Sequence, residues 1–243
     1  LGRKLERLMY ILTGKDKEFA EIKFWRRQIE NYKNWYSGSL TELYGHSTPK
    51  EVDKVKAATN ELSAILTFFK THQMVKDEKD GLWNENDFIG MRLLDIGSGP
   101  FPSSLVFKDC ETFSLDPLMD AYVAAGYPIH CYEQRARFVK SMAESMPFEN
   151  GFFDAVISVN AIDHVNDFGE TAKEIKRVLK PNGRFRMHVH YHPKTKAEPL
   201  ELNDEVFLQH YSWVNNLKKI SVSKHKIGTT IETENESYVV WGN

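Results

Sequence analysis

The chain has 243 residues, of which 41% are apolar and 27% charged, a composition typical of a folded globular domain. Its net charge of −2 argues against a nucleic-acid partner or an anionic membrane surface. No apolar stretch approaches the roughly 20 residues of a membrane span, and no signal peptide is evident, so we expect a cytoplasmic protein. Cys110 and Cys131 stand in no metal-binding spacing, and we expect both to be reduced thiols.

The N-terminal third of the chain is predicted to be helical. A short helix over 1–15 precedes a second helix from Asp16, whose apolar residues recur every three or four positions. The capping box TPKE, from Thr48, opens a further helix, and a polar connector follows it. We therefore predict a helical extension over residues 1–80 and a main domain over 81–243.

From Arg92 onward, apolar runs alternate with helical segments. The runs that predict strands are 91–96, 112–116, 128–132, 153–159 and 184–190. A helix is expected before Pro181, and the C-terminal segment predicts two further strands around a polar turn, at an edge of the sheet. This order is typical of an α/β fold with a mainly parallel sheet and helices on both faces.

The first predicted strand ends in a glycine-rich turn, LLDIGSGP. Glycines let the backbone approach a ligand closely, but the dinucleotide fingerprint GxGxxG would need a third glycine where Pro102 stands. Asp116 ends the next predicted strand, 21 residues after Asp95, where a carboxylate can accept both hydroxyls of a ribose. The pair indicates a nucleoside site. The alternative is that the glycines only form a turn and that Asp116 only caps a helix.

Four segments resemble, in this order, the class I S-adenosylmethionine-dependent methyltransferases: LLDIGSGP, SLDP, AESMPFENGFFDAVISVNAIDHV and EIKRVLKPNGRF. The sequence resembles that of the ubiquinone and menaquinone methyltransferases, closely over about residues 88–192 and loosely in the C-terminal hairpin. The resemblance implies a Rossmann-like, mostly parallel seven-stranded sheet whose last strand inserts antiparallel. It also implies S-adenosyl-L-methionine as cofactor and methyl transfer to a small molecule, without fixing the acceptor.

The resemblance also assigns cofactor contacts. The loop from Asp95 to Gly99 would wrap the methionine moiety, with Asp95 toward its ammonium group, while Asp116 would hold the ribose. Asn160 would lie under the sulfonium. The remaining contacts would come from Gly97, Ser98, Pro100, Pro117, Leu118, Met142, Ala143 and Glu144. Many relatives carry an acid where this chain has Met142, so adenine would be recognised by backbone groups and Met142, or by Glu144.

Two histidines are candidates for the general base if the acceptor is a hydroxyl, because imidazole titrates near neutral pH. His164 follows the fourth predicted strand, beside Asp163, which could orient it or contact the substrate. Packing or helix capping is an equal alternative for His164. Asp163 could also be a solvated helix start.

His190 belongs to RFRMHVHYHP, in which arginines and histidines alternate onto one face of a predicted central strand. Such strands normally read apolar on both faces, so the departure indicates a polar pocket. The HxHxH spacing suits a metal, but no carboxylate or cysteine pattern supports one, and no metal ligand is assigned. Proton transfer or a substrate contact is favoured for His190 or His192, beside the alternative of histidines hydrogen-bonded in a wet layer.

The insert HPKTKAEPLELND and the helix EIKFWRRQIE resemble methyltransferases encoded among surface-polysaccharide and sugar-modifying enzymes. This resemblance favours a sugar or glycan hydroxyl as acceptor, in polysaccharide biosynthesis. Tyr36 and Tyr44 are lid candidates, whereas Trp25 is expected to pack. Two alternatives stay open: N- or C-methylation of another small molecule, and a catalytically silent cofactor-binding module. The oligomeric state is left open.

Overall fold

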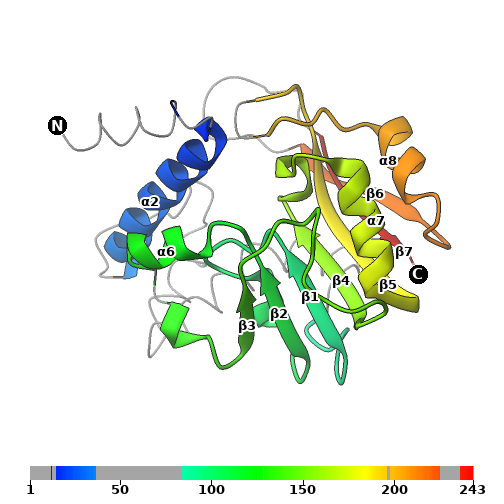
Figure 1. The fold of residues 1–243 in the computed structure, drawn as a ribbon, viewed down its shortest axis with the longest axis horizontal. Helices are drawn as coiled ribbons and strands as arrows, with labels where there is room; N and C mark the ends of the chain where they lie inside the picture. The colour runs from blue at the N-terminus through cyan, green and yellow to red at the C-terminus, as the bar shows by residue number, and fades with distance from the viewer. Residues whose placement is uncertain are drawn as a thin grey trace.

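The computed structural model describes residues 12, 15–36, 84–127, 129–195, 198–224 and 236–242. Its strands form one sheet in the order β3-β2-β1-β4-β5-β7-β6 (Figure 1). Their bounds are β1 Arg92–Ile96, β2 Glu111–Leu115, β3 Ala136–Val139, β4 Phe153–Val159, β5 Leu179–Tyr191, β6 Lys218–Lys224 and β7 Glu236–Gly242. Strands β1 to β5 pair in parallel, and β7 lies antiparallel between β5 and β6. The mainly parallel α/β sheet is confirmed, with the C-terminal strand pair at its edge.

Alternation along the central strands produces two hydrophobic cores, one on each face of the sheet. Leu93 and Ile157 belong to the first core, whereas Leu94 and Val156 belong to the second. The first core is covered by the 3-10 helix Ser103–Val106 and α6, Met119–Ala125; the second is covered by α7, Phe168–Val178, and α8, Asp204–Tyr211. Because both faces are covered, the central strands can be almost wholly apolar.

Helix α7 forms where the sequence predicts a helix. Asp167 caps its start by accepting a hydrogen bond from the backbone N–H of Glu170 at 2.9 Å. Ala172 and Ile175 face the second core and are almost fully buried. The helix ends at Val178, ahead of Pro181, which cannot continue it.

The predicted strand over 128–132 is wrong. Ile129–Cys131 form a 3-10 helix, and the third strand is β3, Ala136–Val139. Ile129 and Tyr132 are buried in the first core, but as part of a turn, and the Tyr132 hydroxyl donates to the carbonyl of Pro100. Apolar content predicted burial here, and burial alone cannot separate a strand from a packed turn.

Helix α2, Asp16–Tyr36, confirms the helix expected from Asp16. It lies beside α6 (Figure 1), and Trp25 packs against the first core with ring contacts to Tyr122 and Tyr127. Tyr44, the helix from Thr48 and most of the helix over 1–15 lie outside the described residues. Within the described part of the chain, the search for a membrane span found no helix of sufficient length and hydropathy.

Candidate functional site

The turn after β1 is tight enough to require glycine. Gly97 and Gly99 both have positive φ, 65° and 58°, which side chains disfavour. A Cβ on Gly97 would lie 2.4 Å from the Cβ of Ala161, and one on Gly99 would lie 3.0 Å from the ring of Trp25. The amides of Gly97 and Ser98 both donate to the carbonyl of Leu115, at 2.9 and 3.2 Å, so β2 holds the turn in place.

Asp116, at the end of β2, ties this turn to the start of α6. Its carboxylate accepts the amide of Gly99 at 3.0 Å and the amide of Leu118 at 2.8 Å. Burial raises the pKa of Asp116 to about 6, although the hydrogen bonds, including one from the Tyr122 hydroxyl, act in the opposite direction. An ionised carboxylate has about four acceptor positions, so about one remains beside these three donors for a hydroxyl group of a ligand.

Asp95, the last polar residue of β1, is 1% exposed. Its carboxylate accepts the amide of Ser104 at 2.9 Å, which anchors the 3-10 helix after the glycine turn. Burial is the main cause that raises the pKa of Asp95 to about 6, and the charge of Asp116 adds to it. Two buried carboxyls of raised pKa form a site that gains by receiving a cation.

The structure brings Asn160 to the same edge of the sheet. It follows β4 with a positive φ of 52°, and its amide donates to the carbonyl of His188 at 3.0 Å. Its buried side-chain oxygen has no hydrogen-bond partner among the described residues. An acceptor in this position can serve a bound ligand.

The other residues assigned to the cofactor differ in their surroundings. Ser98, Pro100 and Ala143 are buried, Pro117 and Leu118 are half-buried, and Met142 is exposed. Glu144 accepts the amides of Asn166 and Asp167, at 2.6 and 3.0 Å, and so fixes the turn before α7. Its other carboxylate oxygen, Oε2, is buried and has no hydrogen-bond partner among the described residues, so both alternatives for adenine stay predictions.

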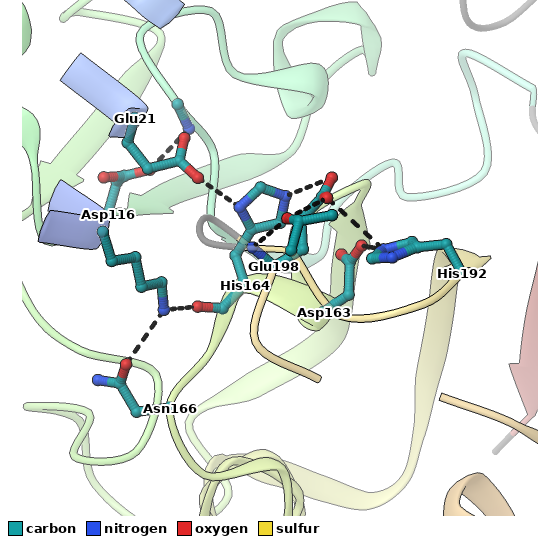
Figure 2. Close-up of polar contacts among 10 residues, drawn as sticks. Glu21, Asp116, Asp163, His164, Asn166, His192 and Glu198 are labelled. Carbon is teal, nitrogen blue, oxygen red and sulfur yellow. Dashed lines mark hydrogen bonds and ion pairs between the residues drawn. The ribbon is translucent and has the colours of Figure 1, made fainter. Parts of the chain in front are cut away.

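A second cluster lies at the carboxyl ends of β4 and β5, where Asp163 and His192 form a buried pair (Figure 2). The Nε2 of His192 donates to Asp163 at 2.9 Å, and its Nδ1 donates to the carbonyl of Pro193 at 2.7 Å. The bond to Asp163 is the largest cause that raises the pKa of His192 to about 9. Burial would raise the pKa of Asp163, but His192 lowers it below its ordinary value.

His164 lies between two carboxylates in this cluster (Figure 2). Its Nδ1 is 2.5 Å from an oxygen of Glu21, and its Nε2 is 3.8 Å from an oxygen of Glu198. Burial acts to lower the pKa of His164, but the bond to Glu21 and the nearby carboxylates raise it overall. Lys17 donates to the carbonyl of His164 and, at 3.1 Å, to the side chain of Asn166.

Sequence reasoning missed Lys17, Glu21 and Glu198. Lys17, Glu21 and Trp25 stand four residues apart and therefore share one face of α2. That spacing was the available signal, but the sequence of the helix does not show which other elements this face contacts. Glu198 lies in the insert after β5, where no motif marks it.

The alternating face of β5 is confirmed. Phe185, Met187 and Val189 enter the second core, whereas Arg186 pairs with Asp87 at 2.7 Å on the other face. The rings of His188 and His190 are 5.3 Å apart. Burial lowers the pKa of His190, against the opposing charge of Asp163. His190 is therefore a neutral imidazole at neutral pH.

Comparison with known proteins finds similar sequences and similar folds. Residues 94–187 match the family model described as a methyltransferase domain. The uncharacterized methyltransferase YcgJ of Bacillus subtilis is 30% identical over 141 residues, 52% of this chain and 55% of that protein. The demethylmenaquinone methyltransferase of Lactococcus lactis is 25% identical over 155 residues, 61% of this chain and 60% of that protein. The chain spans little more than half the length of both relatives.

Solved structures share the fold at lower identity. The crystal structure of YcgJ superposes with a TM-score of 0.52 and 18% identity, covering 71% of this chain and 99% of that one. Phosphoethanolamine N-methyltransferase 2 of Haemonchus contortus, solved with S-adenosyl-L-methionine, gives a TM-score of 0.54 and 14% identity, covering 78% and 59%. Residues 94–187 are therefore similar to a methyltransferase domain, and the described part of the chain shares the fold of solved methyltransferases.

Proposed function

We propose that the protein binds S-adenosylmethionine and transfers its methyl group to a hydroxyl of a sugar or glycan. The observation that carries the first part is the pair of buried carboxyls, Asp95 and Asp116, on either side of a turn that only glycine fits. The cofactor offers a cationic ammonium group and a ribose diol, which suit these two carboxyls. We also propose the domain boundary at about residue 80, with α2 in an N-terminal helical extension and the cofactor site in the main domain.

The residues fit the cofactor in specific roles. Asp95 would hold the ammonium group, and Asp116 would accept the ribose hydroxyls while the glycine turn leaves room for the backbone approach. The orphaned side-chain oxygen of Asn160 would face the reacting end of the cofactor. When bound, S-adenosylmethionine supplies a sulfonium methyl, so the bond from carbon to sulfur breaks as the bond to the acceptor forms and S-adenosylhomocysteine leaves.

The acceptor is argued from the polar cluster at the ends of β4 and β5. Asp163, His164, His192 and Glu198 form a cluster of charged hydrogen-bonding groups. Such a cluster suits an acceptor with several hydroxyls better than an apolar ring, because a polyol can satisfy buried donors and acceptors.

The proton of the acceptor hydroxyl would go to a ring nitrogen of a histidine. His190 is the favoured base, because burial lowers its pKa and leaves a nitrogen lone pair at neutral pH. His164, whose pKa is raised beside Glu21, would be protonated more of the time and would be better suited to orient the acceptor. Separate alanine variants of the two histidines should keep cofactor binding, and the His190→Ala variant should lose more turnover.

The test begins with calorimetric titration of S-adenosylmethionine into the purified chain, followed by a screen of nucleotide sugars and glycans for methyl transfer. Binding with transfer to a sugar hydroxyl supports the proposal. Binding with transfer only to amines or quinone-like carbons would replace the acceptor and keep the class. Folded protein that gives no heat would point instead to a catalytically silent module.

A further inference from the structure

We propose that Asp163, His164 and Glu198 form a binding site for a divalent cation such as Mn²⁺, beside the methyl-transfer site. Each residue offers one ligand atom, and these atoms all lie within 4.8 Å of one another. Asp163 and His164 come from the 3-10 helix after β4, while Glu198 comes from the loop after β5 (Figure 2). The site therefore joins two segments that meet only in the folded chain.

The spacing of the ligand atoms suits a metal ion. The Nε2 of His164 is 3.8 Å from an oxygen of Glu198, too far for a hydrogen bond between them. Bonds of about 2.1 Å to an octahedral ion set neighbouring ligand atoms about 3 Å apart and opposite ones about 4.2 Å apart. A small inward movement of the three side chains would thus bring them to coordination distance.

A second observation comes from Asp163 itself. Its side chain is 1% exposed, and Oδ1 has no hydrogen-bond partner among the residues that the structure describes. The other oxygen, Oδ2, is engaged by His192. A buried carboxylate oxygen without a donor is costly, and a cation would offset that cost.

The surroundings of His164 give a third observation. Glu21 lies 2.5 Å from Nδ1, so that nitrogen donates, and Nε2 is the ring nitrogen that faces Glu198 and would bind the cation. Histidine ligands of metals usually donate their other ring N–H to a carboxylate in this way. His192 has both ring nitrogens engaged, by Asp163 and by Pro193, so it orients Asp163 and does not act as a ligand.

Two carboxylates and one imidazole select among cations. Carboxylate oxygen suits Mg²⁺, Ca²⁺ and Mn²⁺, whereas imidazole suits first-row transition metals, and Mn²⁺ accepts both. Three protein ligands leave coordination positions open. This step rests on the proposed function: two neighbouring hydroxyls of the acceptor would occupy the open positions, and the cation would lower the pKa of the hydroxyl that is methylated.

The direct test is titration of Mn²⁺ into the purified chain at pH 7.5, followed by the loss of the electron paramagnetic resonance signal of free Mn²⁺. We expect saturation at one ion per chain. Glu198→Gln should weaken binding by more than about 100-fold, and Glu21→Gln, which removes only the support of His164, by about 10- to 100-fold. Glu201→Gln is the matched control, because Glu201 is exposed and lies outside the cluster, and it should bind as the unmodified chain does.

Absence of saturable Mn²⁺ binding, or equal affinity in the Glu198→Gln and Glu201→Gln variants, would overturn the site. Calorimetry with S-adenosylmethionine on the same samples separates this failure from failure of the proposed function, because the cofactor site shares no residue with the three ligands. If Mn²⁺ binds but a chelator leaves methyl transfer unchanged, the role of the ion in orienting the acceptor is overturned.

Discussion

The candidate site has two halves that are built in different ways: the proposed cofactor half at the ends of β1 and β2, and the proposed acceptor half at the ends of β4 and β5. At the ends of β1 and β2, the functional groups are held by backbone amides of neighbouring turns, as when Asp116 accepts the amides of Gly99 and Leu118. At the ends of β4 and β5, side chains hold one another across long separations, as when Glu21 contacts His164, 143 residues away. The first half is a local design that recurs as a motif, whereas the second depends on tertiary packing and is free to vary with the acceptor.

This contrast predicts that substitution of a single side chain lowers the free energy of unfolding more in the acceptor half than in the cofactor half. His192→Leu would leave the charge of Asp163 buried without its partner, since the two side chains are 5% and 1% exposed. Removal of one partner of a buried ion pair costs about 3–5 kcal/mol, and we expect the lower end of that range in urea unfolding. The double variant with Asp163→Asn should recover part of the loss. A double variant as unstable as the sum of the two single variants would contradict the pairing.

The cofactor half should instead be sensitive to its backbone. Gly97→Ala adds a Cβ at positive φ and 2.4 Å from Ala161, so strain and overpacking combine to about 2–4 kcal/mol of destabilisation. Gly90→Ala is the matched control, because Gly90 also has positive φ, 73°, but a Cβ there meets nothing within 4 Å. It should cost only about 1–2 kcal/mol. Equal costs by urea unfolding would show that the contact with Ala161 is unimportant.

The next largest effect is expected from the carboxylate of Asp116, on the affinity for S-adenosylmethionine. Asp116→Ala removes charged hydrogen bonds to the ribose and should weaken S-adenosylmethionine binding by about 1–3 kcal/mol in calorimetry. Asp120→Ala, on the exposed side of α6, provides the control and should leave the affinity unchanged. Unchanged affinity in the Asp116→Ala variant, with a native circular dichroism spectrum, would remove the ribose assignment.

The smallest expected effect is the dependence of cofactor affinity on pH. Burial raises the pKa of Asp95 and of Asp116 to about 6, and a bound ammonium group and ribose favour the ionised forms. Affinity should therefore fall as pH drops through 6, by about tenfold at pH 5 if one carboxyl titrates. Calorimetry in buffers of different ionisation enthalpy should detect proton release near pH 6. A flat affinity from pH 7.5 to 5 would contradict this.

The unfolding free energy should depend on pH in the opposite direction from cofactor affinity. Without cofactor, both carboxyls bind protons more tightly in the folded chain than in the unfolded one, because their folded pKa values are raised. Their contribution to the unfolding free energy is thus greatest below the ordinary pKa of aspartate and is lost as pH rises through about 6. Opposite trends for folding and for cofactor binding would locate both effects in the same pair.

The sequence predicted the half of the site that is local. The glycine turn, Asp95 and Asp116 each stand at a fixed place relative to a strand end, so strand prediction was enough to bring them together. The third strand was misplaced because the apolar run after Pro128 is buried without being extended. Edge strand β3, with exposed Arg137, gave a weaker apolar signal than the packed turn before it.

The acceptor half could be predicted only in part. His164 was predicted from its place after the fourth strand, and His190 and His192 from the polar alternation at the end of a central strand. Their carboxylate partners Glu21 and Glu198 were not, since a lone glutamate on a helix or in a loop carries no local mark of its contact. Only the folded chain brings such residues within reach of each other.

Helix α2 has a consequence for how this chain could be shortened. Through Lys17, Glu21 and Trp25 it reaches both the turn after β1 and the segment after β4. A truncated version that starts at residue 84 would keep every strand that the structure describes, yet lose the helix that contacts both segments. A fragment that keeps this helix therefore begins well upstream of residue 94, where the match to the family model starts.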